Sequence, residues 1–360
     1  MIKCKRFSLT DHILSGITVK KLVLYSLLSG LFFNFIYIAE SEANQRSVNV
    51  YSFRHVELIK PLINEFTKQT GIKVNVVSGK ADKLMQRLIQ DGDNSFADVL
   101  LTVGAAKLDK AKQLKLIKPI NSSILQANVP EDLRDPDNYW FALSLRVRAI
   151  FYAKDRVKPQ LLPSYESLLN NRWLGKICSR TGNHFYNRTM VASFVYHYGE
   201  DWTKNWVQKF SENLAMRPNG NDRDQMRKVA RGDCDIAIAN SYYYGMLSSS
   251  VKQSDREVYQ KLGIILPQNM KTGSHVNISG AALTSSAKNV DNAIKVIEFL
   301  TTKKAQKIYA YNNFEFPVRA DIPAGNFIET WGKLNADTLS ILHLSAYSKK
   351  AAEVISQSNW

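Results

Sequence analysis

Apolar runs of membrane-spanning length are absent from this 360-residue sequence beyond residue 39. A membrane-spanning helix needs about 20 consecutive apolar residues, so no segment after that point is expected to cross a bilayer. Low-complexity tracts and internal repeats are also missing. The 45% hydrophobic and 22% charged content is typical of globular domains, and the length is sufficient for two lobes of ordinary size.

Sequence motifs of the common enzyme classes are missing as well. The chain contains no nucleophile elbow, no His-Glu-x-x-His pair, no phosphate-binding glycine loop and no nicotinamide fingerprint. We therefore expect a binding protein and not an enzyme. The enzyme alternative is an exported protein with a single metal ion, which would need an open coordination position and a general base near it.

Positive charge is in excess, with 48 Lys and Arg against 32 Asp and Glu and a net charge of +16. Such an excess can indicate nucleic acid, a membrane surface or an anionic ligand as the partner. The basic residues are scattered between acids on amphipathic segments, and no nucleic-acid motif is present. We expect a solvated basic surface, which could favour anionic lipid or peptidoglycan, and no nucleic-acid partner.

Residues 1–43 have the layout of a secretory signal peptide. Two lysines precede an apolar run over 22–39, and Ser41 and Ala43 are small residues at the −3 and −1 positions of a cut after residue 43. The apolar run is long for such a signal, so an uncleaved membrane anchor is the alternative. The predicted location of the remaining chain is the periplasm.

Strand-like and helical patterns alternate from residue 47 onward. Short runs rich in β-branched residues predict strands over 48–51, 73–77, 97–101, 176–179, 234–238 and 276–283. Apolar residues at helical spacing predict helices after Tyr186 and over 56–70, 81–90, 105–114, 201–214, 222–229, 291–310 (two helices) and 334–356. Such alternation predicts an α/β fold in which mostly parallel sheets are flanked by helices.

The extended apolar stretch 140–154 is a candidate for a strand that runs between two lobes. We expect a first lobe of residues 44–145 plus about 276–317 and a second lobe of 146–275 plus about 318–360. The crossover strands would form a hinge, and the ligand would bind between the lobes, where loops of both sheets meet.

Three consecutive tyrosines stand in the segment Asn240-Ser241-Tyr242-Tyr243-Tyr244-Gly245. The segment follows a predicted strand directly, at the end where α/β proteins place their sites. Ser241 could cap a following helix, which would leave the tyrosines on its first turn. In the alternative, one ring packs, one lies on the surface and one stacks on an organic ligand.

Tyr186 follows the preceding predicted strand through a short polar loop. The spacing from Cys178 to Tyr186 and from Cys234 to Tyr242 is eight residues in both cases. If the two strands are neighbours in register, the cysteines could form a disulfide that holds the two tyrosine loops together, as an oxidising compartment allows. Two small buried thiols are the alternative.

Several phenolic oxygens at one point suit a hard, highly charged cation. Tyrosine ionises near pH 10, so holding one phenolate at neutral pH costs about 3–4 kcal/mol. Ferric iron can offset that cost, because a bound cation shifts the ionisation of its ligands, whereas ordinary divalent ions offset it poorly. The tyrosines therefore favour Fe(III) over Zn(II) or Ca(II).

Histidine and arginine supply the remaining candidates. His55 follows the first predicted strand beside a helix start, and it is either a ligand or a capping or packing residue. His184 and His275 are weaker candidates. A three-histidine zinc site is the alternative, but no two histidines are spaced one helical turn apart as ligand pairs often are. Arg146 and Arg148 face one side of an extended segment, where they could bind a small anion such as carbonate or pair with acids across the cleft.

The chain resembles the periplasmic ferric-iron-binding proteins of ABC iron importers. The resemblance covers essentially the whole chain after the signal segment, and its most specific parts are the tyrosine motif at 240–245 and the string His275-Val276-Asn277-Ile278-Ser279-Gly280. It implies the type II two-lobed fold of periplasmic binding proteins, Fe3+ as transported ligand, carbonate or another small anion beside it, and a monomer that delivers to an ABC permease.

Carried over by position, the resemblance makes Tyr242 and Tyr243 adjacent ligands and Tyr186 the third phenolate. Tyr244 stands where the family commonly has an aliphatic residue, so it is left out of the shell. Arg146 matches a cleft arginine associated with the bound anion.

The first lobe departs from the family pattern. His55 matches a histidine at the mouth of the first lobe, but Val56 stands where many members carry a fourth tyrosine. The first lobe then contributes at most His55, and an anion or water would fill the vacant positions. A receptor for an organic ion, such as a polyamine or a sugar phosphate, is the alternative function.

Overall fold

The computed structural model describes residues 47–268, 272–339 and 341–360. The predicted signal peptide at 1–43 lies outside the described residues. Within the described part of the chain, no helix is both long enough and apolar enough to cross a membrane.

The strands form a mixed sheet in the order β2-β1-β3-β9-β5-β7-β6. Their bounds in that order are Lys73–Ser78, Ser47–Ser52, Val99–Val103, Ser274–Thr284, Phe141–Ala153, Ile236–Asn240 and Ile177–Cys178. Four short strands pair with the long ones: β4 (Ile117–Lys118) and β11 (Ala336–Asp337) with β9, and β8 (Leu262–Ile265) and β10 (Phe316–Pro317) with β5.

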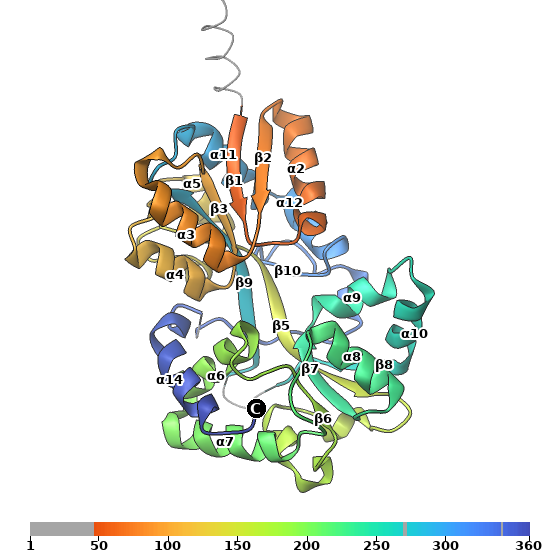
Figure 1. The fold of residues 1–360 in the computed structure, drawn as a ribbon. Helices are drawn as coiled ribbons and strands as arrows, with labels where there is room; N and C mark the ends of the chain where they lie inside the picture. The colour runs from red at the N-terminus through yellow and green to blue at the C-terminus, as the bar shows by residue number, and fades with distance from the viewer. Residues whose placement is uncertain (1–46, 269–271, 340) are drawn as a thin grey trace, which may run out of the picture. The chain divides into compact units, whose positions relative to one another are not determined.

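The long strands β5 and β9 connect two groups of elements (Figure 1). They pair with each other from Phe141 to Val147 of β5. The other edge of β9 pairs with β3 over Ser279 to Leu283, and beyond Val147 β5 pairs with β7. The crossover strand predicted over 140–154 is therefore present. The expected parallel pairing holds for β1 with β3 and for β6 with β7, but β5 and β9 run antiparallel to their long neighbours, so the sheet is mixed and not mostly parallel.

The helices divide between the two groups. Around β1, β2 and β3 lie α2 (Val56–Thr70), α3 (Ala81–Asp91), α4 (Ala105–Gln113), α5 (Ser123–Asn128), α11 (Val290–Leu300) and α12 (Lys303–Tyr311). Around β6, β7 and β8 lie α6 (Phe185–Tyr198), α7 (Glu200–Glu212), α8 (Asp222–Arg231), α9 (Tyr242–Ser248), α10 (Gln253–Lys261) and α14 (Leu344–Ser356), and the short helix α13 spans Asn326–Glu329. This arrangement is the two-lobed fold that the sequence predicted, although the lobe boundaries themselves remain predictions.

The C-terminal helix is shorter than predicted. The sequence predicts a helix that starts at residue 334, but α14 begins only at Leu344. The segment before it contains β11, in which Asp337 pairs with His275 of β9. The backbone hydrogen bonds that β9 offers at its start decide this conformation, and helical periodicity does not reveal them.

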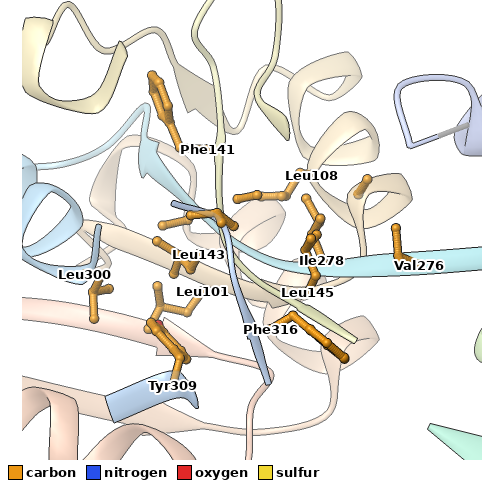
Figure 2. Close-up of a cluster of buried hydrophobic side chains, with 14 of the residues drawn as sticks. Leu101, Leu108, Phe141, Leu143, Leu145, Val276, Ile278, Leu300, Tyr309 and Phe316 are labelled. Atoms are coloured by element: carbon orange, nitrogen blue, oxygen red, sulfur yellow. The ribbon is translucent and has the colours of Figure 1, made fainter. Parts of the chain in front are cut away.

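Two clusters of buried side chains form the core. The larger cluster includes residues of β3, β5, β9 and β10 where these strands meet, and Figure 2 shows Leu101, Leu145, Ile278 and Phe316 within it. The second cluster fills the group around α6 and α7 and includes Trp206, Phe210 and the C-terminal Trp360. The candidate site lies near the end of β7, beside the crossover strand β5 that connects the two groups of elements.

Candidate functional site

Tyr242 and Tyr243 form the first turn of α9, directly after β7. Their ring centroids lie 4.1 Å apart, and a side-chain hydrogen bond joins them. The expected cap at Ser241 forms no side-chain capping bond. Its hydroxyl instead accepts a hydrogen bond from the Val147 backbone N–H at 3.2 Å, which fastens the helix start to β5.

Tyr186 lies on the first turn of α6, which begins one residue earlier, at Phe185. His184 caps this helix, because its Nδ1 accepts a hydrogen bond from the Tyr186 backbone N–H at 3.2 Å. The charge of Tyr186 acts on both Tyr242 and Tyr243. The three predicted phenols therefore lie within electrostatic reach of one another, at the starts of two helices.

Tyr242 and Tyr243 resist ionisation in the absence of a cation. Burial raises the pKa of Tyr242 well above its usual value, Tyr186 and Tyr243 raise it further, and Arg146 acts in the opposite direction. Burial also raises the pKa of Tyr243, with smaller contributions from Tyr186 and Asp222. Both groups are neutral at pH 7, so a ligand that binds them as phenolates has to displace their protons.

Tyr244 points away from this cluster into the core. Its hydroxyl donates to the Leu262 carbonyl at 2.7 Å, and its ring packs 5.7 Å from that of Phe151. The side chain is 5% exposed. The third tyrosine of the motif is thus a packing residue, in agreement with its exclusion from the ligand set.

Two arginines lie beneath Tyr186. The guanidinium carbons of Arg148 and Arg180 lie 5.7 Å and 5.4 Å from the centroid of its ring. Both guanidinium groups bind the buried carboxylate of Asp222, which also accepts a hydrogen bond from the Asn240 backbone N–H at 2.9 Å. Asp222 therefore ties both arginines to the strand end from which α9 departs.

Arg146 belongs to a separate buried network. It donates to the Ser279 hydroxyl at 2.9 Å and to the Ile278 carbonyl at 2.6 Å. Arg54 also donates to Ser279, and it binds both carboxylate oxygens of Glu315, at 2.9 Å and 3.0 Å. Arg146 and Arg148 thus lie against different acids, Glu315 and Asp222, as the pairing alternative predicts.

Arg54, Asp222 and Glu315 were not recognised as site residues from the sequence. Arg54 acts electrostatically on Tyr242, and Asp222 acts on Tyr243. Asp222 is the first residue of α8, whose capping box of Asn221 and Asp224 is a readable signal for a helix start. No pattern in the neighbouring sequence indicates that Asp222 is buried against Arg148.

The histidines are dispersed. His55 is exposed at the N-cap of α2 and makes no side-chain capping bond, so its imidazole is accessible beside Arg54. Burial lowers the pKa of His184 to about 4 and that of His275 to about 3. Within the described ranges, no three His, Cys, Asp or Glu side chains gather as metal ligands, so the three-histidine zinc alternative finds no support.

A disulfide joins Cys178 to Cys234, with Cα atoms 5.9 Å apart. The strand register pairs Cys178 with Ala237 and not with Cys234. The equal spacing of each cysteine from a tyrosine therefore does not reflect the register of the strands. The bond ties β6 to the residues before β7, at the end of β7 opposite to Tyr242.

A cavity of 350 Å³ lies between α2 on one side and residues of α8 and α9 on the other, and none of the three tyrosines lines it. Glu57 and Pro61 of α2 line one side, and Arg223 and Met246 line the other. The guanidinium carbon of Arg223 lies 5.8 Å from the Tyr243 ring centroid, which connects this hollow to the phenol cluster. Larger hollows of 600 and 720 Å³ lie against Trp331 and Trp360, and their linings do not include the tyrosines either.

Comparisons with known proteins all indicate one group of proteins, the bacterial solute-binding proteins. The family model described as bacterial extracellular solute-binding protein matches residues 94–335. Iron uptake protein A1 of Synechocystis sp. PCC 6803 is 39% identical over 323 residues, which are 90% of each chain. The structure of Trichodesmium IdiA (FutA) with iron and citrate ligands superimposes with a TM-score of 0.80 at 40% identity, covering 86% of this chain and 97% of the other. Apo FutA2 of Synechocystis PCC6803 gives a TM-score of 0.80 at 36% identity, covering 87% of this chain and 98% of the other. The chain therefore belongs to the family of bacterial extracellular solute-binding proteins.

Proposed function

We propose that this protein captures Fe(III) in the cleft between its lobes and delivers it to an ABC permease. Tyr186, Tyr242 and Tyr243 are the proposed ligands, and His55 is the candidate ligand from the first lobe. The observation that carries the proposal is the convergence of three phenols, of which Tyr242 and Tyr243 have raised pKa values and are neutral without a cation. Relatives that are named for iron uptake, or were solved with iron and citrate, support the same ligand.

The choice of Fe(III) follows from the donor set. Phenolate oxygens are hard, anionic donors, and only a highly charged cation offsets the cost of ionising several buried phenols together. Among the described residues, no three Cys, His, Asp or Glu side chains gather as ligands, so a thiolate and imidazole cluster of the kind that suits softer metals is missing there. The residues present therefore fit ferric iron better than zinc or calcium.

The charge around the phenols favours a small anion beside the iron. Five arginines, Arg54, Arg146, Arg148, Arg180 and Arg223, lie within electrostatic or ring contact of the tyrosines. Two buried carboxylates, Asp222 and Glu315, pair with four of them. The positive surplus can hold carbonate or another small anion at metal positions that the protein leaves vacant.

The cellular context is part of the same proposal. The signal-peptide pattern at 1–43 supports a periplasmic location, where a monomer would carry iron to the permease. Binding and release would constitute its whole activity, without catalysis. Purified protein titrated with ferric citrate should develop a visible phenolate-to-iron absorption band; a protein that binds a polyamine or a sugar phosphate and gives no such band would contradict the proposal.

A further inference from the structure

The ring of Phe314 lies directly against Gly245, the fourth residue of α9. A Cβ atom built on Gly245 would lie 2.0 Å from Cγ of Phe314, much closer than a methyl group tolerates. Gly245 lies within a helix and has no positive φ, so its backbone does not require glycine. The residue is therefore small because Phe314 occupies the space beside it.

The first lobe holds Phe314 in place from both sides. The Asn313 side chain donates to the Leu58 carbonyl of α2 at 2.8 Å, and the Glu315 backbone N–H donates to the Tyr309 carbonyl of α12 at 3.0 Å. Phe314 itself has a φ of +56°, a conformation that aromatic residues seldom adopt. The surrounding hydrogen bonds maintain this backbone conformation, in which the ring contacts α9.

A second contact of the same kind lies at the other tyrosine helix. A Cβ atom on Gly104, the residue before α4, would lie 2.0 Å from Cζ of Phe185. Phe185 is the first residue of α6 and directly precedes Tyr186. Gly104 also has a φ of +109°, so glycine is required there by the backbone as well as by the ring.

The two contacts run in opposite directions between the lobes. Phe314 extends from the first lobe onto a glycine of the second, and Phe185 extends from the second lobe onto a glycine of the first. We propose that both phenylalanines are positioning residues that fix the angle at which the first lobe meets the two tyrosine helices and thereby slow the loss of bound iron. The iron-loss part of this inference rests on the proposed function, whereas the coupling between the lobes does not.

A double-mutant cycle tests the contact at Gly245. Gly245→Ala, Phe314→Ala and the double variant are loaded with Fe(III), and the rate of iron transfer to excess EDTA is followed by the loss of visible absorption. Gly245→Ala should accelerate iron loss about tenfold, a factor within the usual range for coupled neighbours. Removing the ring makes room for the added methyl group, so Gly245→Ala should have a much smaller effect in the Phe314→Ala background. Independent, multiplying effects would overturn the proposal.

Substitutions that change the size of the side chain at position 185 test the role of Phe185. Phe185→Ala should accelerate iron loss, and Phe185→Leu, which retains most of the bulk, should restore slow release in large part. Phe96→Ala is the matched control, because that ring is 71% exposed, and it should leave the rate unchanged. A Phe185→Ala protein that unfolds at a lower temperature but releases iron at the wild-type rate would show a purely structural role and overturn the proposal.

Failure of the proposed function is distinguishable from failure of this inference. If the wild-type protein binds no iron, the proposed function is wrong. The double-mutant cycle of Gly245 and Phe314 can then be measured by the unfolding temperatures of the ligand-free variants. Coupling between the two substitutions is expected there as well. Additive shifts in that measurement would overturn the interlobe contact itself.

Discussion

The guanidinium group of Arg148 binds the carboxylate of Asp222, and side-chain exposure is only 1% and 0% for the two residues. The pair lies beneath the ring of Tyr186 and is fastened to the end of β7 by the Asn240 backbone N–H. One buried ion pair therefore connects α8, β5 and β7 where the tyrosines converge. Its loss should affect both stability and the geometry of the site.

Substitution of Asp222 by Asn should destabilise the protein strongly. Arg148 would remain buried without its counter-charge, and breaking a buried pair from one side costs about 3–5 kcal/mol. The free energy of unfolding in urea measures this effect. Asp91→Asn is the control, because Asp91 pairs with Arg87 near the surface and should contribute little. Equal small losses in both variants would contradict the importance assigned to Asp222.

Substitution of Tyr242 and Tyr243 together by Phe should abolish the visible ferric band, because the absorption requires phenolate oxygens on the iron. Tyr244→Phe is a matched control from the same motif. It should keep the band and lose about 1 kcal/mol of stability, since its hydroxyl donates to the Leu262 carbonyl. Loss of the band in Tyr244→Phe alone would show that the ligand set is wrong.

Iron should be released as the pH falls. The pKa values of Tyr242 and Tyr243 are raised in the iron-free protein by burial and by neighbouring phenols, so protons compete for the phenolates at any pH below those values. Each step toward lower pH therefore favours the protonated, iron-free form. Absorption measured from pH 8 to pH 4, with circular dichroism to exclude unfolding, checks this, and unchanged retention to pH 4 would count against phenolate ligands.

Replacement of both Cys178 and Cys234 by Ser should lower the free energy of unfolding by about 2–4 kcal/mol, the usual contribution of a disulfide. The bond lies at the end of β7 remote from Tyr242, so the ferric band should keep its position. Denaturation in urea and the visible spectrum give the two readouts. A shifted band with unchanged stability would reverse this assignment and make the bond a support of the site.

The sequence by itself determined most of the secondary structure. The apolar spacing of α2 and the glycine that ends it, and the long apolar stretch of β5, are local signals, and each matches an element in the structure. The tyrosine motif could also be recognised from the sequence, because one short segment contains both the predicted strand end and the consecutive phenol donors that follow it. Local patterns suffice wherever the backbone and its immediate neighbours decide the conformation.

Only the tertiary structure decided which side chains meet. It placed Tyr244 in the core, separated Arg146 from Arg148, brought Asp222 beneath Tyr186, and placed the short strand β11 beside β9 where the sequence predicted a helix start. These outcomes depend on antiparallel crossover strands and on buried charges paired over more than 70 residues of chain. Burial makes such partners obligatory, but their sequence positions follow from the path of the chain through both lobes, which no local pattern encodes.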